Sequence, residues 1–175
     1  MNQTNEKTRT LVMTALMAAI IFVATYIIKI PNPATGGYSH MGDCMIFLAV
    51  IMLGRKSGAI AAGIGGALSD LLAGAAAWIL PTLVIKYIMA FIMGTIIKKN
   101  PESRSLQIGG AVTGGFFQII AYTLVKVVLV GSGPAIASIP NICIQTTVGV
   151  VLFAVLASVL SKRIFRFMGK DGAGK

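Results

Sequence analysis

The residues best suited to chemistry are a few ionisable side chains within or beside strongly apolar stretches. Asp43, Asp70, Lys86 and Lys126 lie there, and His40, the only histidine, comes just before Asp43. Charged side chains at membrane depth are costly, and they usually face a bundle interior or a water-filled cavity. Together these groups supply a positive and a negative charge as well as hydrogen-bond donors and acceptors. This combination is typical of a site that binds a small polar molecule.

Amide, hydroxyl and aromatic side chains extend this set along the helices that must carry it. Gln118, Tyr122 and Lys126 are spaced four residues apart, so they share one helix face. The same spacing recurs in two further pairs, Thr82 with Lys86 and Asn141 with Gln145. The candidate substrate-binding residues are Tyr38, His40, Asp43, Asp70, Trp78, Lys86, Gln118, Tyr122, Lys126, Asn141 and Gln145.

The depths of these residues agree with a single pocket. At about 1.5 Å per residue, Asp70 lies roughly 9 Å from the outer end of its predicted helix. Lys86 lies roughly 12 Å from the same face and Lys126 roughly 6 Å. Asp43 opens its helix from that side. We therefore expect a ligand pocket in the outer half of the membrane.

Each candidate also has a purely structural interpretation. Asp70 and Lys86 can form an ion pair that holds two helices together, and Lys126 can extend to the outer headgroups. Trp78, like Tyr38, can be an interfacial anchor, because aromatic side chains gather at membrane surfaces. Asp43 can serve only as a helix N-cap.

The loop before the second apolar stretch is rich in groups that form hydrogen bonds. It reads Gly36-Gly37-Tyr38-Ser39-His40-Met41-Gly42-Asp43 within a predicted loop from Lys29 to Met41. The helix predicted at 42–53 is too short, at about 1.5 Å per residue, to cross a hydrocarbon core of about 30 Å. Non-helical backbone at that depth must be buried in protein or line a cavity. The short helix therefore predicts a cavity beside the loop.

No catalytic site is expected. The chain has one histidine, no cluster with the usual spacing of metal ligands and no phosphate-binding loop pattern. We expect the protein not to be an enzyme and to hold no cofactor or metal. Any ATP-driven step must come from another chain.

The composition predicts an all-α membrane protein with one domain over residues 1–175. Hydrophobic residues make up 56% of the chain and charged residues only 11%, against about 25% charged in soluble domains. Six transmembrane helices use nearly the whole length, and they are predicted at 9–28, 42–53, 58–76, 78–97, 106–130 and 140–160. Residues 161–175 form a basic tail. Cys44 and Cys143 are interpreted as small buried side chains, although a bond between them stays open.

The basic residues set the orientation. Of the 15 Lys and Arg residues, all but Lys29, Lys86 and Lys126 fall in the N-terminal segment, the tail and two intervening loops. Positive charge favours the cytoplasmic side, so both termini are predicted to be cytoplasmic. The protein is expected to be a multi-pass protein of a bacterial cell membrane.

Several segments resemble the substrate-binding S component of an energy-coupling-factor (ECF) vitamin transporter, within the riboflavin-type group. They are Tyr38-Ser39-His40-Met41-Gly42-Asp43, Arg55-Lys56-Ser57-Gly58-Ala59, Gly63-Ile64-Gly65-Gly66-Ala67-Leu68-Ser69-Asp70-Leu71-Leu72 and Pro81-Thr82-Leu83-Val84-Ile85-Lys86. The resemblance is specific over 38–86 and extends to the rest in pattern only. It implies a six-helix subunit that captures a vitamin outside, beneath the loop between the first two helices.

The resemblance also implies partners. Such subunits dock onto a membrane coupling subunit that works with two cytoplasmic ATPases. An Ala-x-x-x-Ala pattern on the first helix contacts the coupling subunit, and Ala15 and Ala19 match it. Small residues at this spacing also permit contacts within the chain.

The substrate is expected to be small. The polar, charge-balanced set suits a ring with hydroxyl groups, such as pyridoxine or hydroxymethylpyrimidine, and riboflavin and pantothenate remain alternatives. Two other classes of function stay open. One is a structural membrane protein whose charges only pair helices, and the other is a stand-alone proton-coupled carrier.

Overall fold

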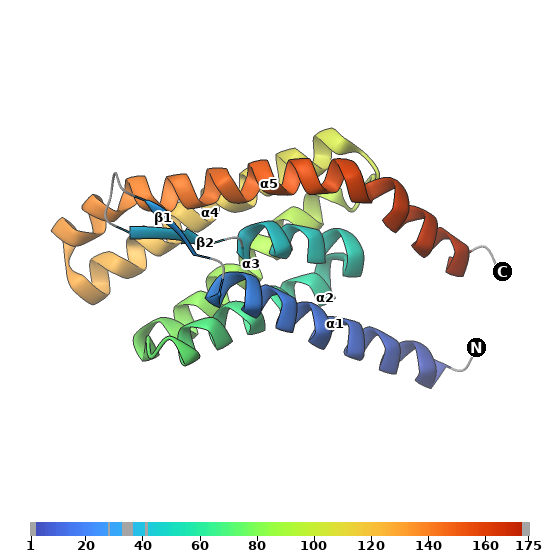
Figure 1. Ribbon diagram of the computed structural model, residues 1–175, viewed down its shortest axis with the longest axis horizontal. Coiled ribbons are helices and arrows are strands. Elements are labelled where there is room, and N and C mark those ends of the chain that lie inside the picture. The colour runs from blue at the N-terminus through green and yellow to red at the C-terminus, as the bar shows by residue number, and fades with distance from the viewer. Residues whose placement is uncertain (1–2, 28, 33–36, 41, 173–175) are drawn as a thin grey trace.

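A computed structural model describes residues 3–27, 29–32, 37–40 and 42–172, with side chains described in 5–27 and 42–159. The elements are α1 (Gln3–Tyr26), β1 (Lys29–Asn32), β2 (Gly37–His40), α2 (Gly42–Leu72), the 3-10 turn η1 (Ala76–Trp78), α3 (Ile79–Ile97), α4 (Arg104–Val130) and α5 (Ser132–Gly172). The start of α1 and the end of α5 lie at one end of the molecule, here called the terminal end (Figure 1). The strands and the α2–α3 and α4–α5 turns lie toward the other end, here called the hairpin end.

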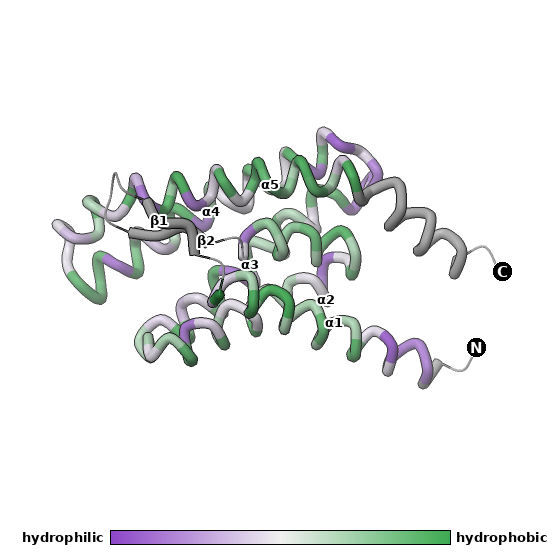
Figure 2. Tube along the Cα trace, in the orientation of Figure 1, coloured by the Kyte–Doolittle hydropathy of each residue, from purple (hydrophilic) through white to green (hydrophobic). Residues whose placement is uncertain are grey.

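The length and apolar composition of the helices are those of membrane-spanning segments. Within the part of the chain that the structure describes, five helices are long and apolar enough to cross a bilayer. Figure 2 shows apolar residues along most of their length, with hydrophilic residues near the start of α1 and at the α3–α4 turn. The chain is therefore an all-helical membrane protein, and its described residues also include a short pair of strands.

The predicted helices 42–53 and 58–76 are two arms of α2. Gly54 separates them with φ 76° and ψ 179°, a backbone conformation open essentially only to glycine. A Cβ placed on Gly58 would lie 2.7 Å from Val50 Cα, whereas eight residues of continuous helix span about 12 Å. The chain therefore folds back on itself at Gly54, and the described residues form five α-helices, of which α2 contains two of the six predicted helices.

The predicted loop from Lys29 to Met41 contains an antiparallel pair of strands, which is a correction. Lys29 pairs with His40 and Asn32 with Gly37. Pro31 stands in β1, opposite Tyr38, and a proline is tolerated there because every strand of a two-stranded sheet is an edge strand. The strands satisfy backbone groups that a loop beside apolar helices would leave unpaired.

The last helix is longer than predicted. α5 begins at Ser132 instead of 140 and includes Pro140 in its interior. The α4–α5 turn is reduced to Gly131, whose φ of 91° closes it. The helix also continues through most of the predicted tail 161–175, as far as Gly172. The predicted start at residue 140 coincides with Pro140, but membrane helices tolerate an internal proline because neighbouring groups satisfy the freed backbone.

The first arm of α2 lies at the centre of the molecule. Nearly all of its residues from Gly42 to Ile51 are buried. Phe47 contacts Phe153 of α5 edge-on, with ring centroids 5.5 Å apart. Because this arm is enclosed on all sides, any polar side chain on it must find its partners inside the protein. Cys44 is buried here, and both it and Cys143 are free thiols.

Candidate functional site

Asp43 is the centre of a buried polar network. It sits in the first turn of α2 with an exposed fraction of 0%. Its Oδ1 accepts a hydrogen bond from Lys86 Nζ of α3, which also makes an ion pair. Its Oδ2 accepts from Gln118 Nε2 of α4 at 2.8 Å and from Gln145 Nε2 of α5 at 3.3 Å. One carboxylate therefore joins four helices.

Gln118 completes the network. Its Oε1 accepts from Lys86 Nζ, and its Nε2 donates to Thr146 Oγ1 at 2.9 Å as well as to Asp43. A primary amide has two donor hydrogens, so both are used. Gln118 is fully buried and Lys86 is 2% exposed. The network therefore satisfies its own groups without a ligand.

A second group of side chains lies beside the network. The Tyr122 hydroxyl donates to Thr82 Oγ1 at 3.1 Å, and Lys86 Nζ lies 5.5 Å from the Tyr122 ring centroid. The Trp78 and Tyr122 rings are 6.0 Å apart and tilted by 40°. Lys126 Nζ lies 6.0 Å from the Trp78 ring centroid. This group, Thr82, Trp78, Tyr122 and Lys126, is here called the aromatic cluster.

Asp70, on the second arm of α2, differs from Asp43. Its Oδ2 is buried and has no hydrogen-bond partner among the described residues. Thr82 is a hydrogen-bonding neighbour of the Asp70 carboxyl group. The structural interpretation that paired Asp70 with Lys86 is wrong, because Lys86 pairs with Asp43. Asp43 in turn does more than cap a helix.

The other predicted residues have mixed outcomes. Tyr38 and His40 lie in β2, which packs against α5, but their side chains are outside the described ones. Asn141 is partly buried one turn before Gln145. Ala15 and Ala19 are exposed on α1, as a contact surface for another chain requires. Whether any of these residues touches a ligand or a partner stays a prediction.

Sequence reasoning missed Thr146. It is 6% exposed and accepts the second hydrogen bond of Gln118. The spacing could have identified it, because Thr146 lies four residues after Ile142 and seven before Phe153, on the same helix face. Both of these neighbours are buried. A hydroxyl on such an apolar face needs an internal partner.

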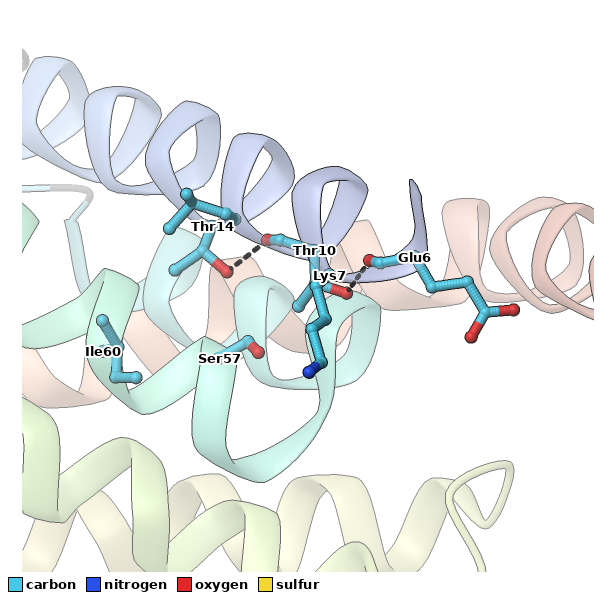
Figure 3. A pocket seen from close by; sticks show the side chains of 7 residues that line it. Glu6, Lys7, Thr10, Thr14, Ser57 and Ile60 are labelled. Carbon is cyan, nitrogen blue, oxygen red and sulfur yellow. Dashed lines mark hydrogen bonds between the residues drawn. The ribbon is translucent and has the colours of Figure 1, made fainter. Parts of the chain in front are cut away.

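Two open grooves run along α1. One, with a volume of about 620 Å³, lies between the first half of α1 and the second arm of α2 (Figure 3). Lys7 points across it toward Ser57, whereas Glu6 points away. The other, of about 290 Å³, is lined by residues of α1 that include Ala19 and by Met45. Neither groove contains a residue of the Asp43 network.

Two relatives align with most of this chain. An uncharacterized protein from Pyrococcus woesei is 36% identical over 144 residues, which cover 82% of this chain and 96% of that protein. The "Thiamine precursor transporter HmpT" of Lactococcus lactis subsp. cremoris is 28% identical over 160 residues, which cover 90% and 91%.

A solved structure shows the same fold. It is the S component for biotin from an ECF-type ABC transporter, which superposes with a TM-score of 0.63 at 21% identity and covers 90% of this chain and 95% of that one.

The model of one family matches nearly the whole chain. It is described as "ECF-type riboflavin transporter, S component" and matches residues 5–162. Members are multi-pass transport subunits of the cell membrane and not enzymes, in accord with five apolar helices in this chain. The chain belongs to the family of ECF-type riboflavin transporter S components.

Proposed function

We propose that this chain captures a small water-soluble vitamin or vitamin precursor for import, with hydroxymethylpyrimidine and pyridoxine as first candidates. It hands the ligand to a membrane coupling subunit driven by two cytoplasmic ATPases, and it needs no cofactor of its own. The observation that carries the proposal is the set of polar side chains enclosed within an otherwise apolar molecule.

The chemistry of the site supports a small ring. The aromatic cluster offers two ring faces, Trp78 and Tyr122, and hydroxyl groups beside them. Aromatic faces favour flat ligands. The Asp43 network supplies a rigid floor on four helices. A relative named as a thiamine precursor transporter supports a pyrimidine, whereas the family description favours riboflavin. Riboflavin and pantothenate are therefore kept as alternatives.

The proposal includes six membrane segments with both ends in the cytoplasm. The fold-back at Gly54 supports it, because each arm of α2 then serves as its own segment. Arg55 and Lys56 follow this fold-back, and Lys98 and Lys99 follow α3, as the cytoplasmic preference of basic residues requires. A membrane-impermeant maleimide should label a Ser132→Cys variant in intact cells and leave a Lys99→Cys variant unlabelled. The reverse pattern would invert the topology.

The test of function is mass spectrometry of small molecules released from the purified, detergent-solubilised chain. Titrations with hydroxymethylpyrimidine, pyridoxine, riboflavin and pantothenate follow, with Trp78, the only tryptophan, as fluorescence reporter. One bound ligand per chain and saturable quenching by that compound support the proposal and name the substrate. An empty chain that none of the four compounds quenches would refute the proposal.

A further inference from the structure

Asp70 holds a buried hydrogen-bond acceptor that the described protein leaves unused. Its Oδ2 has no partner among the described residues. A buried polar atom without a partner costs stability, and the cost is greater when the group is charged. Folded proteins keep such atoms rarely and usually for a reason. The free oxygen therefore points to a group that arrives from outside the chain.

The neighbouring side chains do not fill this position. Lys86 is committed to Asp43 and Gln118, and Thr82 accepts the Tyr122 hydroxyl hydrogen. Lys86 pairs with Asp43 and also attracts the Asp70 carboxylate, but no described side chain donates a hydrogen bond to Asp70 Oδ2. A ligand group that donates a hydrogen bond, or that carries a positive charge, complements this arrangement.

The position of Asp70 connects it with the aromatic cluster. Thr82 is a hydrogen-bonding neighbour of the Asp70 carboxyl group, and Trp78 precedes Thr82 by four residues, about one helical turn. Tyr122 bonds to Thr82 and lies beside the Trp78 ring. A flat ring held against these aromatic faces would bring the atoms on its edge to the carboxylate.

We propose that Asp70 is the specificity-determining residue of the site and accepts an N–H donor from a nitrogen heterocycle. The donor is the exocyclic amino group of an aminopyrimidine or the ring N–H of a protonated pyridine. Asp43 is a positioning residue that organises the site through its network. This inference rests on the proposed function.

The test measures affinity of the full chain in detergent for three compounds. These are the aminopyrimidine form of hydroxymethylpyrimidine, the same pyrimidine without its amino group, and pyridoxine. Asp70→Asn should weaken the preferred ligand about 10- to 100-fold, the range for hydrogen bonds to charged groups. Glu102→Gln is the control, because it removes an exposed carboxylate from the α3–α4 turn, and its affinity should equal that of the wild type.

Comparing the three compounds shows whether the exocyclic amino group or the ring N–H donates the hydrogen bond. If the amino group is the donor, the wild type loses affinity for the deaminated pyrimidine, and Asp70→Asn shows no further loss with it. If the ring N–H is the donor, pyridoxine binds more tightly than the aminopyrimidine and shows the full effect of Asp70→Asn. Equal affinities of Asp70→Asn and the wild type overturn the inference but leave the proposed function standing. A wild type that binds none of the compounds in the wider titration overturns both.

Thermal unfolding without ligand provides a second readout. If Asp70 is kept for the ligand, Asp70→Asn has an unchanged or higher midpoint, because it removes a negative charge whose buried Oδ2 atom has no partner among the described residues. The shift in midpoint on adding ligand should disappear in the same variant. A lowered midpoint without ligand, or failure to fold, would assign Asp70 a structural role and overturn the inference.

Discussion

The carboxylate of Asp43 receives hydrogen bonds from α3, α4 and α5, so a single residue sets how these helices meet. Charges buried in this way contribute less than their Coulomb attraction suggests, because both lose hydration. Removing one partner is a different matter, since the other charge remains in an apolar interior.

Replacing Lys86 with Met should destabilise the protein by about 3–5 kcal/mol, the usual cost of breaking a buried ion pair. Asp43 would be left charged in the protein interior without the ammonium group of its ion pair. Thermal or denaturant unfolding in detergent measures the effect. Lys98→Met changes an exposed lysine at the end of α3 and serves as the control.

The double variant Asp43→Asn with Lys86→Met sharpens this test. It removes both charges, so it should recover part of the stability lost in Lys86→Met. A double variant less stable than the single one would contradict the assignment of the two residues as mutual partners.

Gly149 tests the network through its geometry. A Cβ at Gly149 would lie 2.7 Å from Asp43 Cβ, so Gly149→Ala must displace Asp43 or α5. We expect a loss of about 1–3 kcal/mol, which is typical of overpacking, together with weaker ligand binding. At Gly133 of the same helix, nothing lies within 4 Å of an added Cβ. Gly133→Ala should therefore leave stability unchanged or slightly higher, and equal effects at both positions would refute the argument.

At the level of residues, the sequence identified most members of the network but not their pairing. Asp43, Lys86, Gln118 and Gln145 were all candidates, because polar groups are conspicuous in apolar stretches. Helix spacing gives depth and face, but it does not say which helices are neighbours. The first arm of α2 lies between the others, so it is Asp43, not Asp70, that reaches Lys86.

At the level of elements, the fold depends on the reversal of α2 at Gly54. The reversal places a short buried arm at the centre and a longer arm outside it. The sequence predicted a break here, because its second predicted helix ended at residue 53 and its third began at residue 58. It missed the strands, because four-residue strands that include a proline carry little periodic signal. It also placed the start of α5 too late, at residue 140, because Pro140 lies in the interior of this helix.

Gly54→Ala tests the reversal. The φ of 76° with ψ of 179° should cost a residue with a Cβ about 1–3 kcal/mol. No atom lies within 4 Å of an added Cβ, so the loss in unfolding free energy would measure backbone strain alone. Gly109→Ala in α4, which also has open space around it and no positive φ, should be neutral or stabilising. Equal stability of the two variants would show that the turn relaxes freely.

At the level of the whole molecule, α1 presents an apolar surface beyond the core. The exposed apolar side chains there are Leu11, Val12, Leu16 and Val23. Between them, the exposed surface includes the small side chains of Ala15 and Ala19. Lipid covers such a surface as well as protein does. Small residues, however, allow the close helix approach that membrane helix packing favours.

Ala15→Trp should therefore prevent co-purification with the coupling subunit and ATPases while the isolated chain keeps its ligand affinity. A bulky ring at this position blocks helix contact, and it lies on a helix that contributes no residue to the Asp43 network. Val112→Trp places the same ring on an exposed part of α4 and should assemble normally. Normal assembly of Ala15→Trp would move the interface away from this face.

The Asp43 network also constrains how the protein is made. Asp43 leaves the ribosome 43 residues before Lys86 and 102 before Gln145. During synthesis, the first arm of α2 therefore presents an acidic side chain before its partners on α3, α4 and α5 are made, and lipid is a poor environment for such a group. We expect it to enter the membrane late, or to be held at the insertion machinery until α3 follows. The residue that organises the finished bundle is the one that delays its assembly.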